Sequence, residues 1–243
     1  HMVLHFDVGR KKSVAALEQA MMNDQRIFLV AQRDLDVDDP TVDDIYHVGT
    51  IACIKQVLKL PGDNVRLLVE GRSRAVLRAV TQEEPYFEAA LDEVINPGTP
   101  VSIETDALLR TAHHYFEEYC KTSGRITNDT MQSVLEIEDP GQLADIIAAN
   151  VLSKIDDRQQ VLEEFDDLTR LESVCAMLVK ETELAGVEKK VQARVRKQIE
   201  QNQKDYFLRE QIKAIQTELG DKDATDVEEL RERLAKTPMN DEA

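Results

Sequence analysis

The sequence predicts an α+β protein in which a small β barrel or half-barrel is followed by a helical bundle with one very long helix. Short runs of alternating apolar and polar residues occupy the chain up to about Ile95, as expected for half-buried strands. Beyond residues 96–100 (Asn-Pro-Gly-Thr-Pro) the apolar residues recur at intervals of three and four, as on the buried face of a helix. Two prolines and a glycine in five residues stop either kind of element, so this segment is the expected domain boundary.

The part before the boundary contains the signals of several short strands and one small helix. Residues 3–8 alternate between apolar and polar, and Ile27 begins a short apolar run typical of a buried strand. Residues 61–64 (Pro-Gly-Asp-Asn) form a turn signal between two strands, which are therefore expected to pair as an antiparallel hairpin. The expected strands are 3–8, 27–31, 45–60, 65–69, 75–80 and 86–94, and the expected helix is 13–22.

The part after the boundary carries helix signals with recognisable ends. Asp139 stands where an N-cap is expected and Pro140 occupies the first helical position, so a helix begins there. Gly124 is placed to end the helix that begins near Ile103. The expected helices are 103–122, 129–135, 140–152 and 156–164, and together they predict a bundle that leads into a longer helix.

The most distinctive stretch is 167–219, which contains no proline and only one glycine, Gly186. Good helix formers dominate it, so one helix of roughly 80 Å is predicted, at about 1.5 Å per residue. A helix of this length cannot be covered on all sides by a chain of this size, so part of it must project into solvent or against another subunit. Gly186 is the candidate hinge because glycine weakens a helix interior. Close packing at Gly186 is an equal alternative.

The apolar residues divide this helix into three parts. In the first part they recur at three and four, as on a face packed against a core. The middle part is a stalk whose basic residues lie at 189–197. Its apolar residues recur every four positions, so they drift around the helix instead of forming a coiled-coil seam. Gly220 supplies the expected stop after the last part. The candidate contact residues of this last part, the apolar tip, are Tyr206, Phe207, Leu208, Ile212 and Ile215, followed by Leu219.

A short helix is expected after Gly220. Thr225 and Glu228 are spaced as a capping box, and Pro238 ends the segment. Leu230 and Leu234 share one face, so this helix is expected to fold back on the apolar tip. Two roles for the tip therefore stay open: contact with an unfolded chain or a neighbouring copy, and packing on the returning helix. The expected domains are 1–96, 101–166, 167–220 and 221–243.

Composition argues against several classes of function. The formal charge of −17 repels nucleic acid and anionic membranes as a whole, and aromatic residues, at 5%, are too few for a base-stacking platform. No apolar run approaches the roughly 18 residues of a membrane span and no signal peptide is visible, so we expect no membrane partner and a cytoplasmic location. Cys53, Cys120 and Cys175 lie far apart, which fits buried thiols in a reducing compartment better than disulfides.

No motif for catalysis, cofactor binding or metal binding is found. The chain lacks a phosphate-binding GxxxxGK[ST] loop, a GxSxG nucleophile elbow, an HExxH helix and a CxxC pair. His114 and Glu118 share a helix face, but a solvated face beside a buried Cys120 is the better interpretation. The acidic loop 34–44 has the carboxylate density of a calcium loop without its glycine and glutamate spacing. We therefore predict no catalytic, cofactor or metal residues in this chain.

Residues 203–221, QKDYFLREQIKAIQTELGD, closely resemble the motif that precedes the ATPase module of Lon proteases. Residues 2–10, 16–21, 27–32, 69–71 and 74–75 also resemble the Lon amino-terminal region in the same order, so the resemblance covers essentially the whole chain. It implies a PUA-like β barrel for the first domain. It also implies that the nucleotide site, which uses ATP and Mg, and the serine-lysine dyad lie downstream of the matched region. Many Lon sequences carry Met where Ile212 stands.

The resemblance implies recognition of misfolded or tagged protein substrates and organisation of a hexamer through the long helices, whereas the chain alone is expected to be a monomer or dimer. Met21 and Met22 are further candidates for substrate contact, with core packing the stronger expectation for one of them. An RNA-binding module and a purely structural spacer stay open as alternative functions. The family has a further strand before the segment that matches His1-Met2, so either the β domain is incomplete or these two residues are a cloning remnant.

Overall fold

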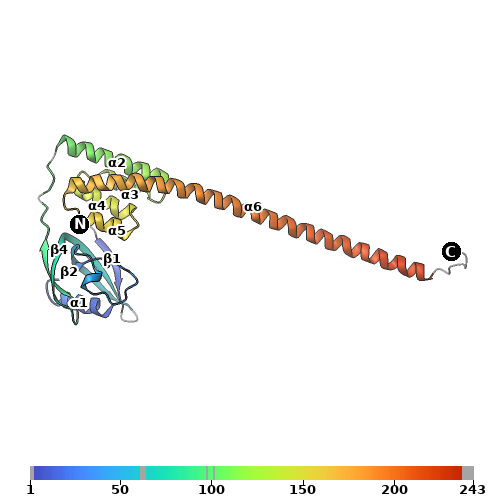
Figure 1. Cartoon of the computed structure of the whole chain (residues 1–243), viewed down its shortest axis with the longest axis horizontal. Helices are drawn as coiled ribbons and strands as arrows, with labels where there is room; N and C mark the ends of the chain where they lie inside the picture. The colour runs from blue at the N-terminus through green and yellow to red at the C-terminus, as the bar shows by residue number, and fades with distance from the viewer. Residues whose placement is uncertain (1–2, 61–63, 97, 101, 237–243) are drawn as a thin grey trace. The chain divides into compact units, whose positions relative to one another are not determined.

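A computed structural model describes residues 3–60, 64–96, 98–100 and 102–236 of the chain (Figure 1). The chain divides into two units, residues 1–184 and residues 185–243. The first unit contains an antiparallel sheet, a small helix and a layer of helices. The second unit consists, in its described part, of the continuation of the last helix. The expected division of the first unit into a β domain and a helical bundle stays a prediction.

The sheet has five strands in the order β1-β4-β3-β2, with β5 also paired to β4. Its strands are β1 (Val3–Val8), β2 (Arg26–Leu29), β3 (Val48–Lys59), β4 (Val65–Gln82) and β5 (Glu88–Glu93). The expected hairpin is confirmed, because β3 and β4 pair antiparallel up to Lys59 and Val65. Its turn residues 61–63 lie outside the described residues, as do His1 and Met2.

One long strand, β4, replaces the two strands expected at 65–69 and 75–80. Its first half pairs with β1, from Val8 opposite Val65 to Val3 opposite Glu70, and its second half pairs with β5. The register between β3 and β4 shifts beside Gly71 and Ser73, and such bulges bend a strand without ending it. The strand therefore changes its partner on one side while β3 stays paired on the other.

The expected small β barrel is wrong, because the described strands form an open sheet. Closure requires the outermost strands of a sheet to pair with each other. Here β1 and β5 lie on the same side of β4, and neither pairs with β2 within the described residues. The alternation of apolar residues that predicted the strands was correct, but it carries no information on which strands meet.

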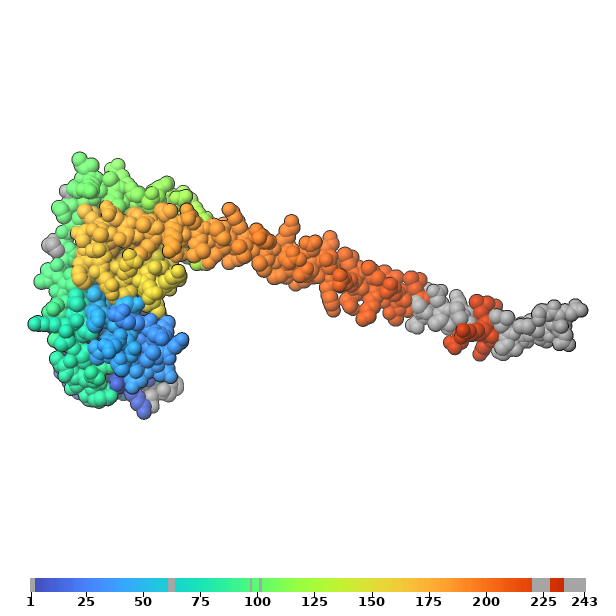
Figure 2. Space-filling model, viewed as in Figure 1, coloured from blue at the N-terminus to red at the C-terminus, as the bar shows by residue number. Residues whose placement is uncertain are grey.

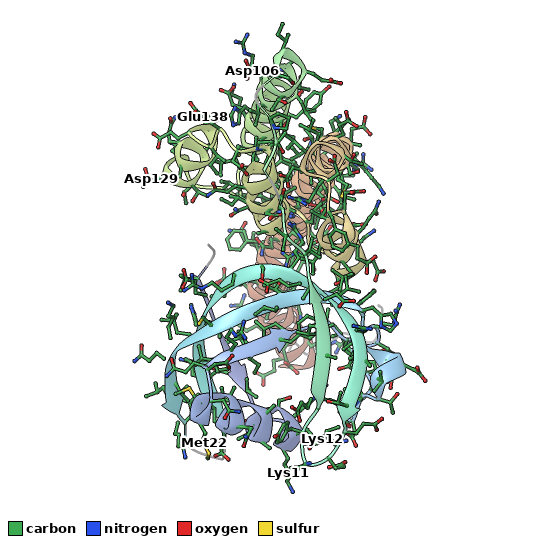
Figure 3. The ribbon with its side chains drawn as sticks, turned by 90° about the vertical axis from the view of Figure 1, so that its left-hand side faces the viewer. Lys11, Lys12, Met22, Asp106, Asp129 and Glu138 are labelled. Atoms are coloured by element: carbon green, nitrogen blue, oxygen red, sulfur yellow. The ribbon has the colours of Figure 1, made fainter. Side chains whose placement is uncertain are left out.

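The small helix α1 (Lys11–Met22) covers part of the sheet through an apolar face. Leu17 and Ala20 are buried against Ile54, Leu67 and Val69. Figure 3 shows Lys11 and Met22 at the outer surface of α1. The expected helix is thus confirmed, and its apolar face anchors it to the sheet.

Five helices follow the linker in the described part of the chain, and the end of α2 and the start of α4 agree with the capping signals. They are α2 (Ile103–Ser123), α3 (Asn128–Leu135), α4 (Pro140–Val151), α5 (Ile155–Glu163) and α6 (Asp167–Lys236). The Asp139 side chain accepts a hydrogen bond from the backbone N–H of Gln142 at the start of α4, and Gly124 ends α2 with a φ of 64°. The core of this layer contains Phe116, Leu143, Ile147, Leu171, Val174 and Leu178 together with Cys120 and Cys175.

Helix α6 does not stop at Gly220, as the sequence had suggested, but continues to Lys236. The separate helix that was expected to fold back on the apolar tip is therefore wrong within the described residues, and Pro238 lies outside them. A single glycine costs a helix only about 1 kcal/mol relative to alanine, and no proline occurs between Asp167 and Pro238. The sequence signals for a stop and a new start were too weak to interrupt the helix.

Candidate functional site

A buried carboxylate, Asp167 at the start of α6, ties the linker after β5 to the helical layer. Asn96 Nδ2 donates to both carboxylate oxygens of Asp167, at 2.7 and 2.8 Å, and Thr99 Oγ1 donates to one of them at 2.9 Å. The guanidinium of Arg170, whose side chain is 1% exposed, donates to the same carboxylate. Gly141 of α4 lies so close that a Cβ there would collide with Asp167 and Arg170. The linker, α4 and α6 therefore share one packed polar site.

The same network reaches the sheet through Asp145 of α4. Its carboxylate pairs with Arg74 of β4 at 2.5 Å and with Arg170 Nε at 3.3 Å. Sequence reasoning missed this network. The only signal was the pairing of Asp167 and Arg170 at i and i+3, because nothing in the sequence connects Arg74 to residues so far along the chain.

A second set of contacts joins β3 to α5. The buried side chain of Gln159 donates from Nε2 to the carbonyl of Val48 at 3.0 Å and to Glu163 Oε1 at 2.9 Å. The Tyr46 hydroxyl donates to Asp156 Oδ1 at 2.8 Å, and this hydrogen bond raises the pKa of Tyr46. These contacts hold the start of β3 and helix α5 in one arrangement.

An open cleft of about 440 Å³ lies between these elements of the first unit. Apolar groups come from two strands and from the segment between α5 and α6, and charged groups lie among them. The lining residues are Arg33, Tyr46, His47, Val48, Val76, Glu163 and Phe165. Sequence reasoning did not single out this cleft, since its residues come from three distant segments.

The candidate tip residues lie on the described part of α6 and are all exposed. Tyr206, Phe207, Leu208, Ile212 and Ile215 expose between 45% and 68% of their surface. Because α6 continues instead of turning back, none of them is covered by a returning helix within the described residues. Figure 2 shows α6 side chains in this stretch at the molecular surface. The packing role considered for the tip thus has no support, and its contact role stays a prediction.

The stalk of α6 also carries exposed apolar side chains. They follow each other at intervals of four, and Val191, Val195 and Ile199 line a shallow groove with Gln192, Arg196 and Glu200. Gly186 lies inside the helix, and its role as a hinge stays a prediction. The apolar side chains that follow each other at intervals of four are Val187, Val191, Val195 and Ile199, and each is about half exposed.

Met21 and Met22 end α1 with exposed side chains, Met22 at 78%. Neither belongs to the buried core, so the core role expected for one of them is not seen. Among residues 103–123, His114 and Glu118 are exposed, and Glu117 pairs with Lys121 at 2.9 Å. In the described part of the chain no group of three or more His, Cys, Asp or Glu side chains is arranged to hold a metal ion. No helix in that part is long and apolar enough to span a membrane.

Comparison with known proteins decides the family. Residues 1–180 match the family described as the ATP-dependent protease La (LON) substrate-binding domain. This chain belongs to that family. Its first unit corresponds closely to the matched residues.

Full-length Lon proteases are similar to this chain over nearly all of its residues. Lon protease of Clostridioides difficile (strain 630) is 43% identical over 242 residues, which cover 97% of this chain and 31% of that protein. Lon protease 1 of Bacillus subtilis (strain 168) is 44% identical, with 99% and 31% covered. The chain therefore spans less than a third of the length of these relatives.

A solved structure agrees with the fold. The N-terminal domain of Mycobacterium avium complex Lon protease superimposes with a TM-score of 0.56 at 23% sequence identity, covering 75% of this chain and 90% of that one. At this identity the likeness supports the fold alone.

Proposed function

We propose that this chain is the non-catalytic substrate-recognition and oligomer-organising region of an ATP-dependent Lon serine protease that degrades misfolded and regulatory proteins. The family match supports a role in binding protein substrates. The missing phosphate-binding loop and nucleophile motifs agree with catalysis elsewhere in the longer relatives. ATP, Mg and the serine-lysine dyad would then act outside this chain, in a cytoplasmic enzyme.

The observation that carries the proposal is the row of exposed apolar side chains along α6. Large exposed apolar surfaces on a folded protein mark contacts with other polypeptides. The row from Val187 to Leu219 is interrupted by charges and glutamines, so each contact with an unfolded chain is weak. Several copies in a hexamer would add such weak contacts by multivalency. The stalk would guide a captured segment and would bring neighbouring copies together.

The experiment is a titration of the whole chain against a labelled, permanently unfolded polypeptide, with single-stranded RNA of similar length as the control. We expect saturable polypeptide binding that survives moderate salt, because apolar contacts are not screened. Salt-sensitive RNA binding would instead favour the nucleic-acid module, for which the basic stalk residues 189–197 are the supporting feature.

A variant with Tyr206, Phe207 and Ile212 all changed to Ser separates recognition from assembly. We expect weaker polypeptide binding at an unchanged oligomeric state, measured by light scattering. A triple change of exposed polar residues on the same helix, Gln198, Gln201 and Gln203 to Ser, is the matched control. If the tip variant keeps full binding, the tip is not a capture surface, and the spacer alternative gains support.

A further inference from the structure

Part of the lining of the cleft in the first unit is held in place by neighbouring contacts. Val48 and Val76 lie opposite each other on β3 and β4, and both contribute to its surface. The Tyr46 ring is held by its hydroxyl bond to Asp156, and the guanidinium of Arg33 lies 4.6 Å from the ring centroid. A cleft whose walls are fixed before binding loses little entropy when a ligand enters.

The backbone around the cleft is already satisfied. The carbonyl of Val48 accepts from Gln159, and the carbonyl of His47 accepts the N–H of Leu77 at 2.6 Å. The N–H of Tyr46 donates to the carbonyl of Ala31 at 2.9 Å. These groups are therefore not available to pair with an extended peptide backbone as an added strand.

Arg33 supplies a positive charge to the cleft. Its Nε donates to the carbonyl of Ile45 at 3.1 Å, and this bond fixes the direction of the guanidinium. Neither Nη atom has a hydrogen bond or ion pair with any residue that the structure describes. Guanidinium groups bind carboxylates with two parallel hydrogen bonds, so a fixed guanidinium with free Nη donors suits a carboxylate ligand.

We propose that this cleft binds the apolar C-terminal residue of a polypeptide, with the side chain against Tyr46, Val76 and Phe165 and the terminal carboxylate on Arg33. The apolar walls and Arg33 line one cleft of about 440 Å³, so a ligand that uses both must carry an apolar group close to a carboxylate. A C-terminal residue satisfies this condition because its carboxylate is attached to its own Cα. Glu163 also lines the cleft, and its negative charge disfavours ligands with several acidic groups. The proposal rests on the proposed role in substrate recognition and names one chemical class of substrate end.

The test is a titration of the whole chain with short acetylated peptides of neutral sequence. One ends in Leu with a free carboxylate, a second is its C-terminal amide, and a third carries Leu-Asp before an amide. We expect the free acid to bind about ten-fold or more tightly than the amide, since a charge-assisted bidentate pair is lost. Equal affinity of acid and amide would overturn the proposal. Equal binding of the Leu-Asp peptide would also overturn it, because the carboxylate would then come from a side chain.

Matched variants locate the binding. Arg33→Gln should remove the preference for the free acid and leave amide binding unchanged, whereas Phe165→Ala should weaken both. Arg78→Gln, an exposed change on β4 outside the cleft, is the control and should change neither. Retention of the acid preference in Arg33→Gln would assign the carboxylate to another site and overturn the proposal.

The titration with unfolded polypeptide distinguishes failure of the cleft proposal from failure of the proposed substrate recognition. If that polypeptide binds but no short peptide does, the cleft assignment fails and substrate recognition stands. If neither binds, both proposals fail. Binding of the free-acid peptide that depends on Arg33 supports both.

Discussion

At the scale of single residues, the buried carboxylate of Asp167 joins three segments of the first unit. It accepts hydrogen bonds from Asn96, Thr99 and Arg170, and Arg170 is itself almost fully buried. Removal of Asp167 would leave the buried charge of Arg170 with Asp145, 3.3 Å from Nε, as its remaining acidic partner, so that charge would be only partly compensated. We therefore expect Asp167→Ala to lower the free energy of unfolding by about 3 to 5 kcal/mol, measured by urea denaturation.

A double-mutant cycle checks this reason for the loss. Arg170→Ala in the Asp167→Ala background should cost less than the sum of the single changes, because the unpaired charge is then removed. Glu117→Gln, which breaks the exposed pair with Lys121, is the control and should leave the unfolding midpoint unchanged. Additive losses would show that Asp167 and Arg170 act independently.

The buried thiol of Cys175 gives the first unit a dependence on alkaline pH. Burial, followed by the Glu172 carboxylate, raises the pKa of Cys175 from 9.0 to about 11. The folded state thus holds this proton more tightly, so the stabilisation is complete below pH 9 and is lost as the pH rises toward 11.

We expect the wild-type chain to lose at most about 3 kcal/mol of unfolding free energy to this group in that range. Urea unfolding at several pH values measures the loss. Cys175→Ala should show a shallower fall than the wild type, whereas the half-buried Cys53→Ala should follow the wild type. Parallel curves for all three proteins would exclude a role for the Cys175 thiol.

The sequence could not reveal these residues in their roles. Arg170 and Asp167 look like an ordinary exposed pair at the start of a helix, because periodicity places apolar residues but does not show which charges the fold encloses. Arg33, Tyr46 and Phe165 come from three segments that only the tertiary structure brings together. For the tip residues the sequence left exposure and packing on a returning helix as alternatives, and the continuous α6 leaves them exposed.

At the scale of elements, local signals were sufficient where the element is short and bounded. The alternation of residues 3–8 gave β1, and Asp139 with Pro140 gave the start of α4. Local signals failed where a long strand or helix continues through residues that only weakly favour a break. The expected gap at residues 70–74 is a bulged part of β4, and Gly220 lies within α6. Pairing between strands far apart in the sequence, which decides between barrel and open sheet, depends on contacts that no local pattern encodes.

Gly220 provides a direct test of the continuous helix. If α6 passes through this position, Gly220→Ala should stabilise it locally by about 1 kcal/mol, since alanine has the higher helix propensity. Slower amide hydrogen exchange at residues 215–230 of the whole chain would be the measured result. A glycine that ends a helix in the left-handed conformation predicts the opposite change, because alanine is strained there. Faster exchange in the variant would therefore indicate that the helix ends at Gly220.

At the scale of the whole molecule, the buried side chains among the described residues lie in the first unit and at Ala185, the first residue of the second. Ala185 is the last residue with a buried side chain among those whose side chains are described, and from Lys189 onward all of these are exposed. Residues 189–197 carry five basic and no acidic side chains, although the whole chain has a formal charge of −17. The first unit thus contains the packed core, whereas nearly all described side chains of the second are exposed.

Truncation after Leu184 tests this separation of roles. Because the removed residues contribute almost nothing to the core, we expect residues 1–184 to unfold within about 2 °C of the whole chain in a calorimetric scan, where 1 kcal/mol corresponds to about 2 to 4 °C. The truncated chain should also keep the binding of free-acid peptides in the cleft, since every lining residue is retained. Its affinity for a long unfolded polypeptide should fall, because the exposed apolar row on α6 is gone. A large drop in unfolding temperature would mean that residues after Leu184 stabilise the first unit, and unchanged polypeptide affinity would place substrate capture entirely within residues 1–184.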